Sequence, residues 1–183
     1  MVSERSTNSQ FVVWLTGLPG SGKTTLGNNL LSKLKELDVR TELLDGDIVR
    51  KELSPELGFT KEDRELHARR VIYLSKLLSR NGIGSIVSLI SPYRELRTFA
   101  KKEIGIGFVE VYVNCSLEIC IERDPKGLYK KALEGKIQNL TGLQDPYEEP
   151  LSPDLIVYTA KETIEESTNK ILVKLRESGF LDR

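Results

Sequence analysis

The strongest constraint on the fold of this chain is a glycine-rich segment at residues 17–24, which has the sequence Gly-Leu-Pro-Gly-Ser-Gly-Lys-Thr. It matches the G-x-x-x-x-G-K-[ST] pattern of a phosphate-binding loop. An apolar run at residues 11–16 precedes it, and a segment with helical periodicity at residues 22–37 follows it. Because glycine has no Cβ, such a loop turns tightly and brings backbone N–H groups and a helix N-terminus close to a phosphate. The segment therefore predicts a strand–loop–helix unit that binds a nucleoside triphosphate.

Within this motif, Lys23 is expected to contact the β- and γ-phosphates of ATP, and the Thr24 hydroxyl is expected to bind Mg²⁺. A glycine-rich turn that merely precedes a helix is the alternative, and the eight matching positions in the right context disfavour it. The predicted ATP-binding residues are Gly17, Leu18, Pro19, Gly20, Ser21, Gly22, Lys23, Thr24 and Thr25.

Apolar, strand-like runs alternate with amphipathic helical segments along the chain. Strands are expected at residues 11–16, 39–44, 83–90, 108–113 and 154–158, and helices at residues 22–37, 60–80, 93–104, 116–122, 125–134 and 161–178. This alternation predicts an α/β fold, a three-layer P-loop NTPase-type parallel sheet of about five strands flanked by helices. Ligands of such sheets bind at the carboxyl ends of the strands.

Three ranges describe the expected domain organisation. Residues 1–10 are polar and predict a flexible lead, and residues 11–183 predict a single P-loop kinase domain. Within that domain, residues 124–153 are rich in Gly, Pro and Lys and interrupt the alternation, which predicts a mobile lid. The lead lacks the apolar core of a signal peptide, and no apolar run approaches the roughly 20 residues of a membrane span.

Charge and cysteine content narrow the functional classes further. Lys plus Arg and Asp plus Glu both number 27, so the formal net charge is zero, which argues against a nucleic-acid binder. Cys115 and Cys120 have no companion Cys or His at metal-ligand spacing. They are expected to be small buried side chains of a cytoplasmic protein.

A phosphate-binding loop does not say what is done with the nucleotide. The N-K-x-D element of a GTPase is absent, because residues 169–172 carry Leu where Asp is required, and the D-x-x-G-like residues 124–127 follow a predicted helix and not a strand. An ATP-driven motor would carry Asp after the third strand, where this chain has Ser91. A small-molecule kinase is therefore the favoured class.

The acidic residues that a kinase needs follow the second predicted strand, where Asp45-Gly46-Asp47 occurs. One carboxylate can support Mg²⁺ and the other can accept a proton from the attacking hydroxyl. An ordinary Asp-Gly turn that caps the next helix is the alternative. The position at a strand carboxyl end beside the phosphate loop favours the functional interpretation.

At this point the chain resembles the adenylylsulfate kinase family, also called APS kinases, over nearly its whole length after the first ten residues. The matching motifs occur in order: WLTGL at 14–18, LDGDIVR at 44–50, LGFTKEDR at 57–64, ISPYR at 90–94, RDPKGLYKK at 123–131, TG at 141–142 and DPYE at 145–148. The resemblance implies Mg²⁺-dependent transfer of the ATP γ-phosphate to the 3′-hydroxyl of adenosine 5′-phosphosulfate (APS). The products are 3′-phosphoadenosine 5′-phosphosulfate (PAPS) and ADP, in sulfate assimilation. It also implies a homodimer. The zero net charge and the lack of a membrane-length apolar run separately predict no nucleic-acid and no membrane partner.

The resemblance implies roles for particular residues. Asp47 is the expected general base or orienting group and Asp45 the metal-shell carboxylate, with the reverse assignment open. Lys23 and Ser91 complete the expected catalytic set, with Ser91 preferred as a residue that positions the acceptor over a phosphorylated intermediate. The metal-binding residues would be Thr24 and Asp45. The implied acceptor-binding residues are Asp47, Arg50, Phe59, Arg64, His67, Ile90, Ser91, Lys126, Gly127, Leu128 and Leu140.

Two of these positions depart from the family pattern. His67 stands where the family usually has Asn, and Leu140 stands where it usually has a Phe that stacks on the acceptor adenine. A related kinase for another small nucleotide conjugate is therefore an alternative. A non-catalytic nucleotide-binding regulatory domain is a second alternative, which the intact Lys23, Thr24, Asp45 and Asp47 disfavour.

Overall fold

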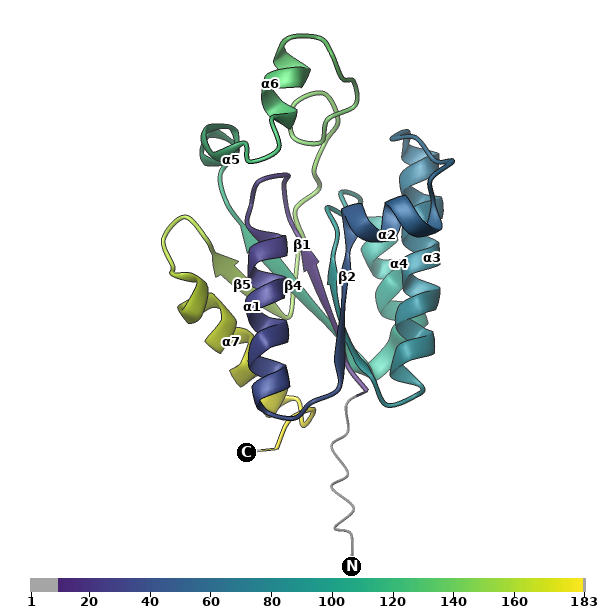
Figure 1. The fold of residues 1–183 in the computed structure, drawn as a ribbon, viewed down its shortest axis with the longest axis vertical. Coiled ribbons are helices and arrows are strands. Elements are labelled where there is room, and N and C mark those ends of the chain that lie inside the picture. The colour runs from purple at the N-terminus through teal and green to yellow at the C-terminus, as the bar shows by residue number, and fades with distance from the viewer. Residues whose placement is uncertain (1–9, 183) are drawn as a thin grey trace, which may run out of the picture.

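The computed structural model describes residues 10–182. Within this range, five parallel strands form a sheet in the order β2-β3-β1-β4-β5. The strands are β1 (Val12–Thr16), β2 (Thr41–Asp45), β3 (Gly84–Ser88), β4 (Phe108–Asn114) and β5 (Leu155–Tyr158). Their carboxyl ends meet along one edge of the sheet, the upper edge in Figure 1. The predicted α/β parallel-sheet fold is confirmed, while the lead expected at residues 1–10 lies, except for Gln10, outside the described residues.

Helices cover both faces of the sheet, with α1 and α7 on one side and α2, α3 and α4 on the other (Figure 1). The helices of the described range are α1 (Lys23–Glu36), α2 (Gly46–Leu53), α3 (Lys61–Ser79), α4 (Arg94–Ile104), α5 (Leu117–Arg123), α6 (Leu128–Leu133) and α7 (Ile164–Glu177), with a 3₁₀ turn, η1 (Gly105–Gly107). None of the helices in residues 10–182 has both the length and the apolar character that crossing a membrane requires.

The central strand β1 is buried on both faces, and its side chains alternate between two hydrophobic cores. Val13 and Leu15 pack with α1 and α7, whereas Val12 and Trp14 pack with α3 and α4. This alternation follows from the two-residue period of a strand. The phosphate loop that follows β1 is thus anchored at the centre of the sheet.

Helix α2 was not predicted. Eight residues with Gly46 at the start and Val49 as the buried residue carry almost no apolar periodicity. The helix begins because the Asp45 carboxylate accepts hydrogen bonds from the Asp47 and Ile48 N–H groups, as an N-cap does. The expected helix at 125–134 is also shorter than predicted, because α6 starts only after Gly127, whose φ is +65°.

The predicted lid, residues 124–153, contains α6 and one isolated bridge between Thr141 and Asp145, and is otherwise irregular. Its helix stands above the carboxyl edge of the sheet (Figure 1). The mobility expected of this segment stays a prediction.

Candidate active site

A cavity of about 650 Å³ opens along the carboxyl edge of the sheet. Its volume is in the range of pockets that enclose a small ligand. The residues that line it fall into three groups: the phosphate loop with the start of α1; α2, α3 and the end of β3; and the α5–α6 connection with the segment between β5 and α7. Since β1 is the central strand, the phosphate loop lies between the other two groups.

The phosphate loop has the close backbone packing that its glycines predicted. A Cβ on Gly17 would lie 2.6 Å from the Val113 carbonyl oxygen, and Gly20 has a φ of +76°. Both positions therefore exclude larger residues. The loop leads into α1, whose first turn contains no acidic residue, so the helix N-terminus is free to attract an anion. Pro19, Gly20, Gly22, Lys23, Thr24 and Thr25 line the cavity, while Gly17, Leu18 and Ser21 form the loop beneath it.

Lys23 is buried and its ammonium group is held by the loop itself. Nζ donates hydrogen bonds to the carbonyl oxygens of Gly17, at 2.8 Å, and Leu18, at 2.7 Å. Burial lowers the pKa of Lys23 to about 8. A bound phosphate would place a negative charge beside the Lys23 ammonium group and so favour its charged form.

The Asp-Gly-Asp segment caps a helix and also lies beside the phosphate loop. One oxygen of Asp45 caps α2, and the other accepts a hydrogen bond from Thr24 Oγ1 at 2.8 Å. Asp45 is buried, whereas the Asp47 side chain is exposed and forms an ion pair with Lys126 from the opposite side of the cavity. Helix capping thus places both carboxylates beside the phosphate loop.

The oxygen donors of Thr24 and Asp45 fit Mg²⁺. Thr24 and Asp45 present a hydroxyl and a carboxylate oxygen, the hard donors that Mg²⁺ prefers. Residues 10–182 contain no cluster of three or more His, Cys, Asp or Glu side chains that could hold a metal ion alone. An ion at this position would therefore depend on nucleotide phosphates and water for its remaining ligands.

Two arginines and a phenylalanine lie at the α2–α3 end of the cavity. The Arg50 and Arg64 guanidinium carbons lie 4.9 Å and 5.7 Å from the centre of the Phe59 ring. Burial, and then the positive charge of Arg64, lowers the pKa of Arg50. Two cations held this close, next to an exposed aromatic face, are suited to an anionic ligand that carries a flat ring.

The arginines are oriented by backbone carbonyls. Arg50 Nη1 donates to Gly58 O at 2.7 Å, Arg64 Nε donates to Phe59 O at 2.9 Å, and Arg64 Nη2 donates to Asn139 O at 2.7 Å. Thr60 caps α3, since its side chain accepts a hydrogen bond from the Asp63 N–H. His67 lies one turn further along α3, is buried and lines the same cavity.

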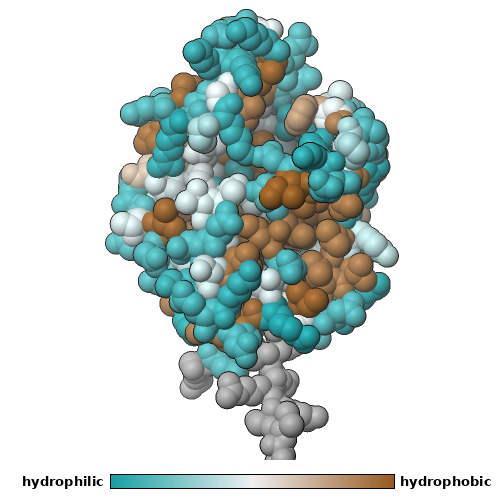
Figure 2. All heavy atoms as spheres, in the orientation of Figure 1, coloured by the Kyte–Doolittle hydropathy of each residue, from teal (hydrophilic) through white to brown (hydrophobic). Residues whose placement is uncertain are grey.

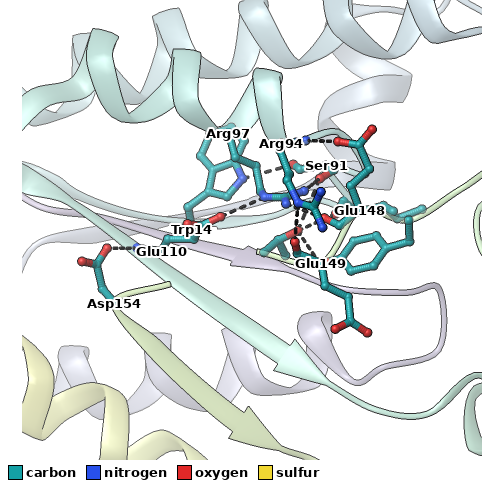
Figure 3. A network of polar contacts seen from close by, with 11 residues as sticks. Trp14, Ser91, Arg94, Arg97, Glu110, Glu148, Glu149 and Asp154 are labelled. Atoms are coloured by element: carbon teal, nitrogen blue, oxygen red, sulfur yellow. Dashed lines mark hydrogen bonds and ion pairs between the residues drawn. The ribbon is translucent and has the colours of Figure 1, made fainter. Parts of the chain in front are cut away.

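Ser91 follows β3 and has a φ of +47°, a left-handed conformation that is uncommon for a residue with a side chain. Its Oγ accepts a hydrogen bond from Trp14 Nε1 at 3.1 Å, and its carbonyl accepts one from Arg97 Nη1 at 2.5 Å (Figure 3). Ile90 and Ser91 both line the cavity. The strained turn is thus held from the side of the sheet and from the side of α4.

Arg97 connects this turn to two other segments (Figure 3). Its Nε forms an ion pair with Glu110 of β4 at 2.9 Å, and its Nη2 donates to the Glu148 carbonyl. Both side chains of the pair are almost fully buried. No pattern around Arg97 in the sequence identified it, because a single arginine on a helix is most often a surface residue.

The lid helix α6 is attached to the phosphate loop. Asp124 carboxylate oxygens accept from the N–H groups of Tyr129, at 3.1 Å, and Lys130, at 2.9 Å. The buried Tyr129 hydroxyl donates to the Pro19 carbonyl at 2.9 Å. Lys126 and Leu128 line the cavity.

Gly127 and Leu140 do not line the cavity. Leu140 is buried in a cluster with Cys115, Cys120 and Tyr129 beneath α6. The two cysteines are free and buried, as predicted. Contact between Leu140 and an acceptor stays a prediction that requires a shift of this segment.

The lining residues between β5 and α7 were missed by the sequence analysis, which named no site residue after the fifth predicted strand. Thr159 follows β5, and its hydroxyl donates to Ser21 O at 2.7 Å. Arg123 Nη2 donates to Thr159 O at 2.7 Å. Since β5 is parallel to β1, its carboxyl end had to lie at the same edge, and that signal was available in the sequence.

The parallel sheet, its strand order and the phosphate loop with adjacent Thr24, Asp45 and Asp47 define a P-loop kinase fold and site. Comparison with known proteins specifies the family. A sequence profile described as adenylylsulphate kinase matches residues 9–158. The chain therefore belongs to the adenylylsulphate kinase family.

Individual relatives agree with this assignment. A "Probable adenylyl-sulfate kinase" of Pyrococcus abyssi is 53% identical over 171 residues, which cover 93% of this chain and 98% of the relative. The structure of the Mycobacterium tuberculosis APS kinase CysC in complex with AMPPNP and APS is similar with a TM-score of 0.88 and 38% identity, over 91% of this chain and 97% of that one. A hexameric APS kinase from Thiobacillus denitrificans matches with a TM-score of 0.73 and 34% identity, over 94% of this chain and 30% of that one.

Proposed function

We propose that this protein transfers the γ-phosphate of ATP to the 3′-hydroxyl of APS, which yields PAPS and ADP in sulfate assimilation. The observation that carries the proposal is a cavity in which the phosphate loop lies between two other groups of lining residues. The structure of the Mycobacterium tuberculosis relative is a complex with AMPPNP and APS, which supports a site for two nucleotides.

ATP would bind with its phosphates on the loop and its nucleoside towards Arg123 and Thr159. The backbone N–H groups of residues 17–24 and the start of α1 would hold the phosphates. Lys23 would leave its carbonyl partners to contact the β- and γ-phosphates. Thr24 and Asp45 would hold Mg²⁺, which neutralises phosphate charge when it is bound.

The acceptor would occupy the α2–α3 end. Arg50 and Arg64 would bind its phosphosulfate oxygens, and Phe59 would contact its adenine. Ile90 and Ser91 would orient the ribose from the end of β3. This one group of side chains therefore suits both the flat base and the double anion of the acceptor.

The transfer is then direct and in line. The 3′-oxygen of APS forms a bond to the γ-phosphorus, and the bond from that phosphorus to the β–γ bridging oxygen breaks, which releases ADP. The Asp47 carboxylate takes the hydroxyl proton. Asp47 becomes available as the base when the bound phosphates attract Lys126 and break the Lys126–Asp47 ion pair. Ser91 positions the acceptor and stays unmodified.

The first test is ADP release from Mg-ATP with APS and with a panel of other nucleotides, for the wild type, Asp47→Ala and Glu52→Ala. Glu52 is exposed on the same helix and is the matched control. We expect APS to be the one nucleotide of the panel that supports turnover with Mg-ATP. We expect kcat to fall at least about 100-fold in Asp47→Ala and to stay unchanged in Glu52→Ala. Turnover with a different nucleotide in place of APS would show that APS is not the acceptor. ATP binding without turnover would favour a regulatory domain.

Assembly and location complete the proposal. We propose a cytoplasmic homodimer without nucleic-acid or membrane partners. Figure 2 shows apolar side chains gathered over the region where β2 and α3 lie in Figure 1, and the exposed apolar residues of α2 and α3 include Ile48, Leu53 and Leu66. Such patches commonly mark protein contact surfaces. Light scattering during size-exclusion chromatography should give twice the chain mass of 20.6 kDa, and a single chain mass would contradict the dimer.

A further inference from the structure

His67 is the only histidine of the chain and lies buried on α3, at the acceptor end of the cavity. Its Nδ1 atom lies 3.0 Å from the hydroxyl oxygen of Ser54, which follows α2. Its Nε2 atom is closed off from solvent and has no hydrogen-bond partner among the described residues. A neutral imidazole carries its proton on one of these two nitrogens, and the position of that proton decides what the ring can bind.

Arg70 settles the direction of the hydrogen bond. Its Nη1 donates to the Leu53 carbonyl at 2.6 Å and lies 3.2 Å from Ser54 Oγ. An arginine has donors only, so Ser54 Oγ accepts from Arg70. Ser54 is fully buried, and the contacts of the described residues offer its single hydroxyl hydrogen one acceptor, His67 Nδ1. The Ser54 hydroxyl therefore donates to Nδ1, and the imidazole proton is on Nε2.

The surrounding charges keep the ring neutral. Arg50 of α2 and Arg70 of α3 both face it, while Glu56, from the segment between these helices, is paired with Arg70 at 2.6 Å. Burial, together with these two positive charges, lowers the pKa of His67 to about 4. At neutral pH the ring is thus an uncharged donor at the end of the cavity where Arg50 and Arg64 are cationic.

We infer that Ser54 and Arg70 are positioning residues that hold His67 as a neutral Nε2–H donor for an oxygen or ring nitrogen of the acceptor nucleotide. A buried donor without a partner is unfavourable, and an acceptor atom that reaches Nε2 when the surrounding residues shift on binding would remove that cost. The identity of the acceptor as APS rests on the proposed function. The tautomer itself does not, because it is set within the ligand-free protein.

The tautomer is measured directly by ¹⁵N NMR on untagged protein labelled at its single histidine. At pH 7 we expect a protonated, pyrrole-type Nε2 and an unprotonated, pyridine-type Nδ1. A proton on Nδ1, or on both nitrogens, overturns the inference. Arg70→Met removes the other donor to the Ser54 oxygen, which leaves that oxygen more available to a ring N–H, so the Nδ1–H form should increase. Ser54→Thr keeps the hydroxyl and should leave the spectrum unchanged. An unchanged spectrum in Arg70→Met contradicts the role of Arg70.

The effect on binding is measured by steady-state kinetics with Ser54→Ala and Ser54→Thr. Loss of the hydroxyl should raise KM for APS about 3- to 10-fold and leave KM for ATP unchanged, and Thr should restore the wild-type value. Equal KM values for APS in all three proteins overturn the positioning role, and thermal unfolding checks that Ser54→Ala is folded. If no APS is turned over while NMR finds the Nε2 proton, the proposed function fails and the tautomer stands.

Discussion

Lys23 and Thr24 are neighbours at the start of α1, yet their polar atoms meet different partners. The Lys23 ammonium binds carbonyls of its own loop, whereas the Thr24 hydroxyl reaches across to Asp45. Both groups are engaged in the ligand-free protein and are the groups assigned to phosphate and metal. Substrate binding would therefore exchange hydrogen bonds, and would not simply add them.

Lys23 gives a prediction about protons. With a pKa of about 8, about half of its ammonium groups are neutral at pH 8 in the ligand-free protein. Phosphates favour the charged form, so ATP binding at pH 8 should take up about half a proton per site, and uptake should disappear towards pH 6.5, where Lys23 is already protonated. Calorimetry in buffers of different ionisation enthalpy measures this. In Lys23→Arg the side chain is always charged and uptake should be absent; equal uptake there would exclude Lys23 as the source.

Two substitutions at Asp45 distinguish its role as the N-cap of α2 from its proposed role in catalysis. Asp45→Asn keeps an oxygen to cap α2 but removes the charge, so stability should stay close to wild type while kcat falls. Asp45→Ala removes both and should also cost about 1 kcal/mol of unfolding free energy. Chemical denaturation and ADP-release assays on the two variants test this. Full activity in Asp45→Asn would rule out a role for the carboxylate charge.

At the scale of elements, the turn after β3 and the segment at 145–149 are joined to the sheet through Arg97 on α4. Burial raises the pKa of Glu110, and the paired guanidinium opposes that shift. Removing one partner would leave a buried group uncompensated. A variant that lacks Arg97 would also leave the Ser91 carbonyl without its donor, so the geometry of the active site should change.

Arg97→Met should therefore reduce the free energy of unfolding by about 3–5 kcal/mol and raise KM for the acceptor. Adding Glu110→Gln removes the orphaned carboxylate and should recover part of the stability but not the KM. Urea denaturation and kinetics on the single and double variants measure both effects. A stability loss below about 1 kcal/mol in the single variant would show that the ion pair contributes little.

The contact between α6 and the phosphate loop gives a second prediction for elements. Tyr129→Phe removes the buried hydrogen bond to the Pro19 carbonyl and should cost about 1 kcal/mol. Because Pro19 belongs to the loop, KM for ATP should rise several-fold. Tyr73→Phe, on an exposed part of α3, is the matched control and should change neither quantity. Wild-type ATP kinetics in Tyr129→Phe would show that the contact does not shape the loop.

For the whole molecule, the sheet order β2-β3-β1-β4-β5 explains how one cavity joins distant parts of the chain. It places α2 and α3 on one side of the phosphate loop and the segment after β5 on the other. Residues as far apart as Arg50 and Thr159 thereby line one space. The sequence predicted that the strand ends share an edge, but the neighbours of each strand came from the packed sheet.

The sequence by itself determined the strand–loop–helix unit, the alternation of strands and helices, and the position of the two acidic residues. These features are local, because they depend on side-chain periodicity and on glycine and aspartate at fixed spacing. Only the tertiary structure decided that Arg97 is buried, that Tyr129 meets Pro19 and that Leu140 packs beneath α6. These outcomes depend on contacts between residues far apart in the sequence, and such contacts exist only once the sheet has brought their elements together.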